Sequence, residues 1–303
     1  MLLRYPIKSF SFLICFHLKQ NQNKVSSQRY KFCLFTLLMM LKKKNRRFSI
    51  MAAGSKGSGK SSFFNTLFNN DIVPLESSND INLYMLNVDC EGVTQKVNLI
   101  DTPGFGNTLS DKENQDSIIS FIKMQFDAFI EEESKIRRDP TFEDTRVHCL
   151  LYFIPSTVNG LKETDISFLS KAKSLVNIVP VISKSDGVSI VERTILKEKV
   201  RNQLSDNGIE VFDFENQEYY DNINEGERIN DFIPFFVVSS SEDNVTSRVR
   251  KFKWGTVEVD NTEHCDFTVL KEILLGTHLS VLIDYTASEL YEKYRSQMLE
   301  ERN

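Results

Sequence analysis

The sequence predicts an α/β fold in which a doubly wound, mostly parallel sheet is covered by helices on both faces. From Arg46 onward, short apolar segments of strand length alternate with amphipathic segments of helix length. Strands that are apolar throughout are typical of parallel sheets, which are buried on both faces. The expected strands are 47–53, 97–101, 147–154, 175–183 and 234–240, and the expected helices are about 60–69, 113–133, 163–174 and 190–206.

Three segments depart from this alternation. Residues 80–101 predict two strands joined near Glu91, as a hairpin at the edge of the sheet. Residues 213–231 are acidic and rich in turn-forming residues, which indicates a surface insertion. After Trp254, two further helices are expected at about 267–278 and 282–300.

The start of the expected helix 190–206 is marked by a capping signal. Ser189 and Glu192 have the Ser-x-x-Glu spacing of a capping box. In that motif the two side chains each accept a hydrogen bond from the other residue's backbone N–H. We therefore expect the helix to begin directly after Ser189.

The composition is that of a soluble globular protein. Of the 303 residues, 41% are hydrophobic and 26% are charged. The five cysteines are scattered, which indicates free thiols in a reducing compartment rather than disulfides or a zinc site. The longest apolar run, Phe32–Leu41, is shorter than the roughly 18 residues that a membrane-spanning helix needs.

Charge is distributed unevenly along the chain. Residues 1–50 hold 11 Lys or Arg and no acid, whereas the rest holds 26 basic (37 − 11) and 42 acidic side chains. Such a basic end predicts contact with an anionic surface. Residues 1–41 are expected to be a poorly structured extension, either a disordered tail or part of an over-long gene model that truly starts at Met39 or Met40; a targeting segment is the less favoured alternative.

The segment GSKGSGKSS predicts a phosphate-binding loop. It satisfies G-x-x-x-x-G-K-[ST] between an expected strand and an expected helix. Its backbone N–H groups and the helix N-terminus would surround phosphate oxygens, Lys60 would reach the β- and γ-phosphates, and Ser61 would bind Mg²⁺. The alternative is a glycine-rich turn without a ligand. The predicted phosphate-binding residues are Gly54, Ser55, Lys56, Gly57, Ser58, Gly59, Lys60, Ser61 and Ser62.

Two later motifs complete a nucleotide site. In DTPGFG, Asp101 is placed to contact magnesium-bound water, and the Gly104 N–H to sense the γ-phosphate. In SKSD, Asp186 can accept hydrogen bonds from N1 and N2 of guanine while the Lys184 stem covers the base. Adenine lacks those donors and would leave the carboxylate unpaired, so the motif selects GTP over ATP.

The order of these three motifs resembles that of the septin family of guanine-nucleotide-binding proteins. The segment WGTVEVDNTEHCDFTVLKEILLGTH, residues 254–278, resembles the septin unique element, which other P-loop GTPases lack. The resemblance covers about residues 42–300. It implies a Ras-like P-loop NTPase fold, with a GTP-binding domain over 48–245 and the unique element plus C-terminal helices over 246–303.

The resemblance also implies a nucleotide held at a contact between subunits. The cofactors would be GTP or GDP and Mg²⁺. Arg250 would lie near the guanine, and Ser239 stands where the family has a Gly that approaches the base. Trp254 and Glu192 would lie at the interface, together with Asn159, which stands where the family usually has a His. The expected partners are other septin subunits, in hetero-oligomers and possibly homo-oligomers.

The basic run before the first strand matches a polybasic segment that septins often carry. It consists of Lys42, Lys43, Lys44, Arg46 and Arg47. In the family this segment binds phosphoinositides and anionic membranes, and clustered cations gain about 1 kcal/mol each near such a surface. The alternative is a solvated charge run or a nuclear-type signal. No nucleic-acid partner is expected, and the implied location is the cytoplasm, in cytoskeletal rings at the cell cortex or division site.

The switch region departs from the family pattern. Septins that hydrolyse GTP have a Thr between the phosphate loop and DTPG, but no Thr occurs from Leu67 to Val93. Counting back from Gly92, that position falls on Met85, and Ser77 or Ser78 would have to shift by several residues to replace it. These features predict slow or absent GTP hydrolysis in a filament-forming, short-tailed septin. The alternative is a hydrolysing GTPase switch that acts as a monomer or dimer.

Overall fold

The computed structural model describes most of the chain beyond its basic N-terminal end. The described residues are 2–4, 46–76, 78, 80–90, 93–106, 111–139, 141–157, 159–215, 228–240, 248–253 and 255–301. Lys42, Lys43, Lys44, Ser77 and Trp254 therefore lie outside them. No helix of the described part combines the length and apolar character needed to cross a membrane.

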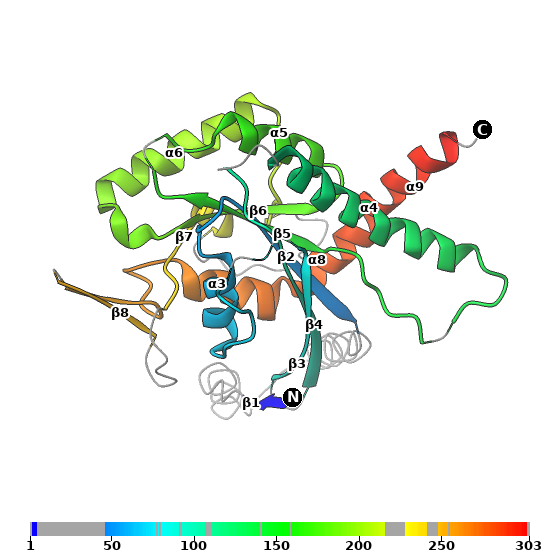
Figure 1. Cartoon of the computed structure of the whole chain (residues 1–303), viewed down its shortest axis with the longest axis horizontal. Coiled ribbons are helices and arrows are strands. Elements are labelled where there is room, and N and C mark those ends of the chain that lie inside the picture. Colours follow the sequence, from blue (N-terminus) through cyan, green and yellow to red (C-terminus); the bar gives the residue numbers. More distant parts are fainter. Residues whose placement is uncertain are drawn as a thin grey trace, which may run out of the picture.

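The described strands form a mostly parallel sheet, as predicted (Figure 1). Its seven strands lie in the order β1-β3-β4-β2-β5-β6-β7, and the pair β3–β4 is antiparallel. The prediction that the β3–β4 hairpin forms the edge was wrong, because β1 pairs with β3 on its outer side. The strands are β1 Leu2–Arg4, β2 Arg47–Gly54, β3 Asn82–Cys90, β4 Val93–Asp101, β5 Cys149–Pro155, β6 Asn177–Ser183 and β7 Phe235–Val237.

Helices cover both faces of this sheet. Figure 1 shows α4, α5 and α6 over one face, and α3 and α7 over the other. The predicted capping box is confirmed, because α6 begins directly after Ser189, whose side chain accepts a hydrogen bond from the Glu192 N–H. The helices are α3 Lys60–Phe68, α4 Asp111–Ser134, α5 Glu163–Ala172 and α6 Ile190–Asp206.

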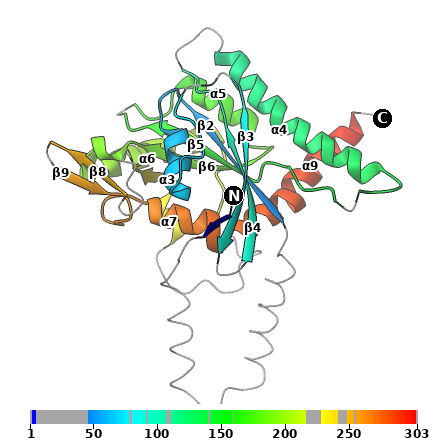
Figure 2. The ribbon, with the colours of Figure 1, turned by 60° about the horizontal axis from the view of Figure 1, so that its bottom comes forward.

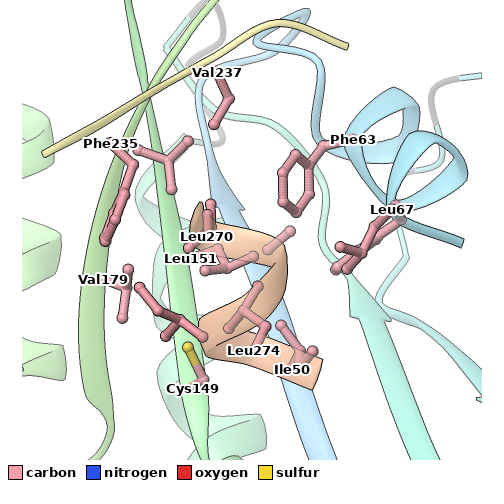
Figure 3. Packing of buried hydrophobic residues seen from close by; sticks show 14 of the residues in the cluster. Ile50, Phe63, Leu67, Cys149, Leu151, Val179, Phe235, Val237, Leu270 and Leu274 are labelled. Atoms are coloured by element: carbon pink, nitrogen blue, oxygen red, sulfur yellow. The ribbon is translucent and has the colours of Figure 1, made fainter. Parts of the chain in front are cut away.

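The core is divided between the two faces by the alternation of side chains along each strand. On β2, Phe48, Ile50 and Ala52 pack into one cluster, and Met51 and Ala53 into the other. Figure 3 shows the first cluster, where Phe63 and Leu67 of α3 and Leu270 and Leu274 lie against β2, β5 and β6. Burial on both faces explains why these strands are apolar throughout.

As predicted, two helical stretches follow β9 (Gly255–Glu258), and they meet at a bend at His278. The first comprises α7 Phe267–Glu272 and the π-helical turn η3 Ile273–Thr277. The second comprises α8 Leu279–Tyr285, the π-helical turn η4 Thr286–Leu290 and α9 Tyr291–Glu300. At η4, the Thr286 hydroxyl and the Asn177 amide both donate to the Leu282 carbonyl, which accounts for the local irregularity. Figure 2 shows α9 running beside α4.

The predicted insertion at 213–231 is only partly a surface segment. Phe214 is fully buried, and its N–H donates to Asn230 Oδ1. The short helix η2, Ile229–Phe232, then leads into β7. Both ends of this segment are thus packed against the domain. A separate hairpin of β8 Val249–Phe252 and β9 Gly255–Glu258 lies at the end of the molecule opposite α9 (Figures 1 and 2).

Candidate functional site

The predicted phosphate loop connects β2 to α3. Gly54 ends the strand with φ +141°, and a Cβ there would overlap the Phe153 carbonyl oxygen on β5. A side chain is therefore excluded at the point where the chain leaves the sheet. Ser55 and Ser58 are buried within the loop, and Gly59 caps α3 in a left-handed conformation.

Lys60 lies buried at the first position of α3. Its Nζ donates to the carbonyl oxygens of Gly54, at 3.2 Å, and Ser55, at 3.0 Å. Burial lowers the pKa of Lys60 to about 8, and the nearby Asp101 carboxylate opposes this shift. A phosphate chain beside Lys60 would favour the ammonium form for the same electrostatic reason.

Asp101 and Ser61 form the predicted metal-binding pair. The Ser61 hydroxyl donates to Asp101 Oδ2 at 2.8 Å, whereas Asp101 Oδ1 is buried without a hydrogen-bond partner. Burial raises the pKa of Asp101, and the Ser61 hydrogen bond and the Lys60 charge oppose the rise. A hydroxyl and a buried, partly unpaired carboxylate are suitable oxygen ligands for Mg²⁺ or its bound waters, so these residues fit the ion.

The DTPGF loop packs directly on the phosphate loop. The Lys56 N–H donates to the Phe105 carbonyl at 2.9 Å, and the Phe105 N–H donates to the Gly54 carbonyl at 3.3 Å. A Cβ on Gly104 would overlap the Lys56 backbone. Because Gly104 has no side chain, its backbone can lie close to the position that a phosphate held by the first loop would occupy.

The predicted base-reading residues follow β6. Lys184 has φ 56°, and its carbonyl accepts a hydrogen bond from the Ser156 hydroxyl at 2.9 Å. Asp186 has a largely buried side chain whose Oδ1 accepts from Arg250 Nη1 at 3.2 Å. The structure thus brings Arg250 of β8 to the carboxylate that would read guanine. Ser239 is half-buried after β7.

One cavity of about 390 Å³ extends from the phosphate loop to Lys184, whereas Asp186, Ser239 and Arg250 are not among the residues that line it. Lys60, Asp101, Gly104 and Lys184 all line it. The other predicted residues on its wall are Lys56, Gly57, Gly59, Ser61 and Ser62. Ser78, considered above as a replacement for the switch Thr, also lines it, and sequence reasoning missed five further lining residues, which are Leu75, Glu76, Asp80, Asn82 and Thr102. Most of these come from an irregular segment without periodicity, so no pattern marked them.

The structure changes the interpretation of the switch segment. Met85 lies on β3 opposite Asn98 with 68% of its side chain exposed, and it does not line the cavity. Ser78 lines the cavity without the shift of several residues that the sequence implied. Its hydroxyl accepts a hydrogen bond from the Asp80 N–H at 3.0 Å, which holds it in a local turn.

The described interface candidates lie on exposed segments. Asn159 is exposed in the loop after β5, and Glu192 is exposed while it completes the cap of α6. Around Glu192, sequence reasoning missed an exposed aliphatic group. Its members are Ile190, Val191 and Ile195, whose side chains are 78%, 71% and 60% exposed. They lie outside the buried face of α6, which consists of Leu196, Val200 and Leu204. Aliphatic residues outside that face were the sequence signal that could have indicated a contact surface.

The two described basic residues at the start of β2 are both ion-paired. Arg47 forms an ion pair with Glu143, and its side chain is only 11% exposed. Arg46 forms an ion pair with Asp284 of α8. Arg47 therefore contributes to the packing of the domain, unlike a freely solvated cation.

Comparison with known proteins identifies the family. The Septin family model matches residues 44–303. Cell division control protein 11 of Encephalitozoon cuniculi is 55% identical over 262 residues, covering 86% of this chain and 98% of that protein. Septin-9 of Rattus norvegicus is 37% identical over 278 residues, covering 86% of this chain and 49% of that protein, so the chain spans about half its length.

Solved structures agree on the fold. The crystal structure of Cdc11 from Saccharomyces cerevisiae matches with a TM-score of 0.56 and 28% identity, covering 83% of this chain and 99% of that one. The septin GTPase domain from Chlamydomonas reinhardtii matches with a TM-score of 0.65 and 22% identity, covering 84% and 99%. The predicted P-loop NTPase fold and the resemblance are both confirmed: the chain belongs to the septin family.

Proposed function

We propose that this chain is a septin subunit that binds guanine nucleotide with Mg²⁺ at a subunit contact and assembles with other septins into filaments or rings. The observation that carries the proposal is the single cavity lined by Lys60, Asp101, Gly104 and Lys184. These residues supply groups for the phosphate chain, the metal ion and the base. Bound Mg²⁺ would neutralise phosphate charge, and the protein groups would bind and orient the nucleotide.

Each group of residues in and beside the cavity has a separate task in this proposal. Lys60 and the backbone N–H groups of residues 55–61 bind phosphate oxygens. Ser61 and Asp101 hold the ion, and the Gly104 N–H contacts the terminal phosphate. On the other side, Asp186 accepts the two hydrogen bonds of guanine, and Arg250 places a positive charge beside this carboxylate.

The hydrogen bonds of two hydroxyls on the switch side support slow or absent hydrolysis. The Ser78 hydroxyl bonds within its own turn, and the Thr102 hydroxyl donates to the Ala52 carbonyl. Both are therefore committed to backbone groups and are not oriented toward an attacking water. The alternative function, a hydrolysing GTPase switch, would require one of them to change partners or Ser77, which lies outside the described residues, to take the role.

The exposed aliphatic group of α6 supports assembly through the nucleotide side of the molecule. The base-reading loop, residues 184–186, ends shortly before this group, whose members are Ile190, Val191 and Ile195. Burying such side chains against another subunit would contribute about 1.5–3 kcal/mol each. Septins form oligomers with other septins, so we assign this surface to a second septin subunit. We place these assemblies in the cytoplasm, at the cortex or division site.

The first prediction concerns base selectivity. Asp186→Asn should weaken GDP binding at least about tenfold, because a hydrogen bond to a charged partner is worth about 1.5–3 kcal/mol. The same variant should gain affinity for xanthosine diphosphate, whose base has a carbonyl oxygen where guanine has its amino group. Fluorescent-nucleotide competition measures both affinities. Asp206→Asn, at the end of α6, is the matched control, and an unaltered preference in Asp186→Asn would contradict the assignment.

The second prediction concerns hydrolysis. Protein purified without added nucleotide should release mainly GTP on denaturation, as identified by ion-exchange chromatography, with phosphate release near background. Met85→Thr should leave that background rate unchanged, because the residue lies on the outward side of β3. Mostly GDP together with measurable phosphate release would instead support the hydrolysing alternative.

The third prediction concerns assembly. The double variant Ile190→Ser, Ile195→Ser should weaken association with a second septin subunit at least about tenfold, because two aliphatic contacts are lost. Sedimentation equilibrium measures this change. Met124→Ser with Ile136→Ser removes two exposed apolar side chains elsewhere. Equal weakening by both pairs would rule out α6 as the specific contact.

The fourth prediction concerns membranes, which we propose are bound by Lys42, Lys43 and Lys44, because Arg46 and Arg47 each have an acidic partner in the fold. Changing the three lysines to Gln should lower sedimentation with phosphoinositide-containing vesicles by roughly two orders of magnitude, at about 1 kcal/mol per cation. Arg47 is left intact because it pairs with Glu143. Lys112, Lys123 and Lys293, all exposed, provide a charge-matched triple control. Unchanged vesicle binding would refute this assignment.

A further inference from the structure

Arg193 of α6 connects two segments that are far apart in the sequence. Its Nη2 donates to the Ser185 carbonyl at 2.9 Å, and its Nη1 donates to the His264 carbonyl at 2.8 Å. Both bonds have a charged donor and are therefore stronger than bonds between neutral groups. One guanidinium thus holds the base-reading loop and the segment that follows β9.

The carbonyl bound by Arg193 controls the direction of the base-reading carboxylate. Ser185 C=O belongs to the planar peptide unit that joins Ser185 to Asp186. This plane contains the N and Cα atoms of Asp186, so fixing the carbonyl also fixes the orientation of the backbone that carries the Asp186 side chain. The residue before it, Lys184, is in the left-handed region, and Ser185 is fully buried. The loop is short, so a change in this peptide has few neighbouring residues to absorb it.

The other end of the Arg193 contact is anchored to the sheet. His264 lies two residues before Asp266, whose N–H donates to the Phe236 carbonyl at 2.7 Å. The Asp266 carboxylate in turn accepts from the Phe236 N–H at 2.8 Å. The Arg193 guanidinium lies 5.8 Å from the centre of the Phe236 ring. Arg193 therefore attaches the base-reading loop to β7 by way of the segment after β9.

The same part of the molecule reaches Asp186 by a second route. Arg250 of β8 pairs with the Asp186 carboxylate directly, and the hairpin β8–β9 leads to His264. Figures 1 and 2 show α6, β7 and this hairpin at one end of the molecule. Asp186 is thus held from its side chain by Arg250 and from its backbone by the Arg193 contact.

We propose that Arg193 is a positioning residue for guanine recognition, which sets the Asp186 carboxylate by holding the Ser185 carbonyl against the segment after β9. This inference rests on the proposed binding of guanine nucleotide. It assigns Arg193 to the base and not to the phosphates, because its two described hydrogen bonds go to the loop that carries Asp186 and to the segment after β9. A planar guanidinium can bind two separate carbonyls at once, whereas a lysine ammonium reproduces this geometry poorly.

The test compares GDP with inosine diphosphate, which lacks the 2-amino group that Asp186 would bind. The ratio of the two affinities reports how well the carboxylate is placed. Arg193→Gln should reduce this ratio by about fivefold or more, because removal of a charged hydrogen bond frees the loop. The affinity ratio of Arg193→Lys should lie between those of Arg193→Gln and the wild type. Competition binding is measured below the unfolding temperature of each variant.

Arg201→Gln is the matched control. Arg201 also lies on α6 and donates to backbone carbonyls, of Ile233, Asn230 and Asp231, but it does not contact the base-reading loop. Its loss should lower thermal stability and leave the affinity ratio unchanged. A role of Arg193 in stability alone would make the two variants behave alike.

The outcomes separate this inference from the proposed function. A wild-type protein that binds GDP and inosine diphosphate equally would overturn guanine recognition, and with it the role of Arg193. A clear wild-type preference that survives in Arg193→Gln, or that falls equally in Arg201→Gln, would overturn only the role of Arg193. If Arg193→Gln does not fold, the milder Arg193→Lys decides by the same ratio.

Discussion

The parallel register of β4, β2, β5 and β6 is the constraint on which the candidate site depends. Ala52 of β2 lies opposite Asp101 of β4, Gly54 lies opposite Phe153 of β5, and Pro155 of β5 lies opposite Ser183 of β6. Because these strands run the same way, the chain leaves each of them at the same edge. Three motifs distant in the sequence thereby line one cavity. A single strand in the opposite direction would remove one of them to the far edge.

Local signals predicted well because they depend on neighbouring residues. The cap at Ser189 involves groups three positions apart, so the local sequence contains its whole explanation, and the glycine-rich loop after β2 matches a motif of fixed spacing. The π-helical turn η4 within the second C-terminal helix was not predicted, for the opposite reason. Asn177, which donates to the Leu282 carbonyl, is 105 positions away from it, and no local pattern predicts that contact. Met85 was assigned to the switch by counting residues, which ignores the direction in which a strand's side chains point.

The basic residues at the start of β2 also show that long-range contacts cannot be predicted from a local pattern. Arg46 and Arg47 belong to a run of basic residues that is uniform in the sequence, yet each has its own acidic partner in the fold. Arg47 is largely buried by Glu143, which is 96 positions away, so its charge serves the packing of β2. The cations that remain for the proposed contact with an anionic surface are therefore Lys42, Lys43 and Lys44. Counting charges predicts the sign of a contact, but burial decides which residues can make it.

In the function proposed above, helix α6 would connect base recognition to assembly. Arg193 holds the base-reading loop, while Ile190, Val191 and Ile195 of the same first turns are exposed. A helix moves as a rigid element, so a shift on one of its sides is transmitted to the other. If guanine binding stabilises one position of α6, and a second subunit packs on that position, each ligand must favour the other by the same factor. A nucleotide that is retained would then strengthen the subunit contact without being hydrolysed.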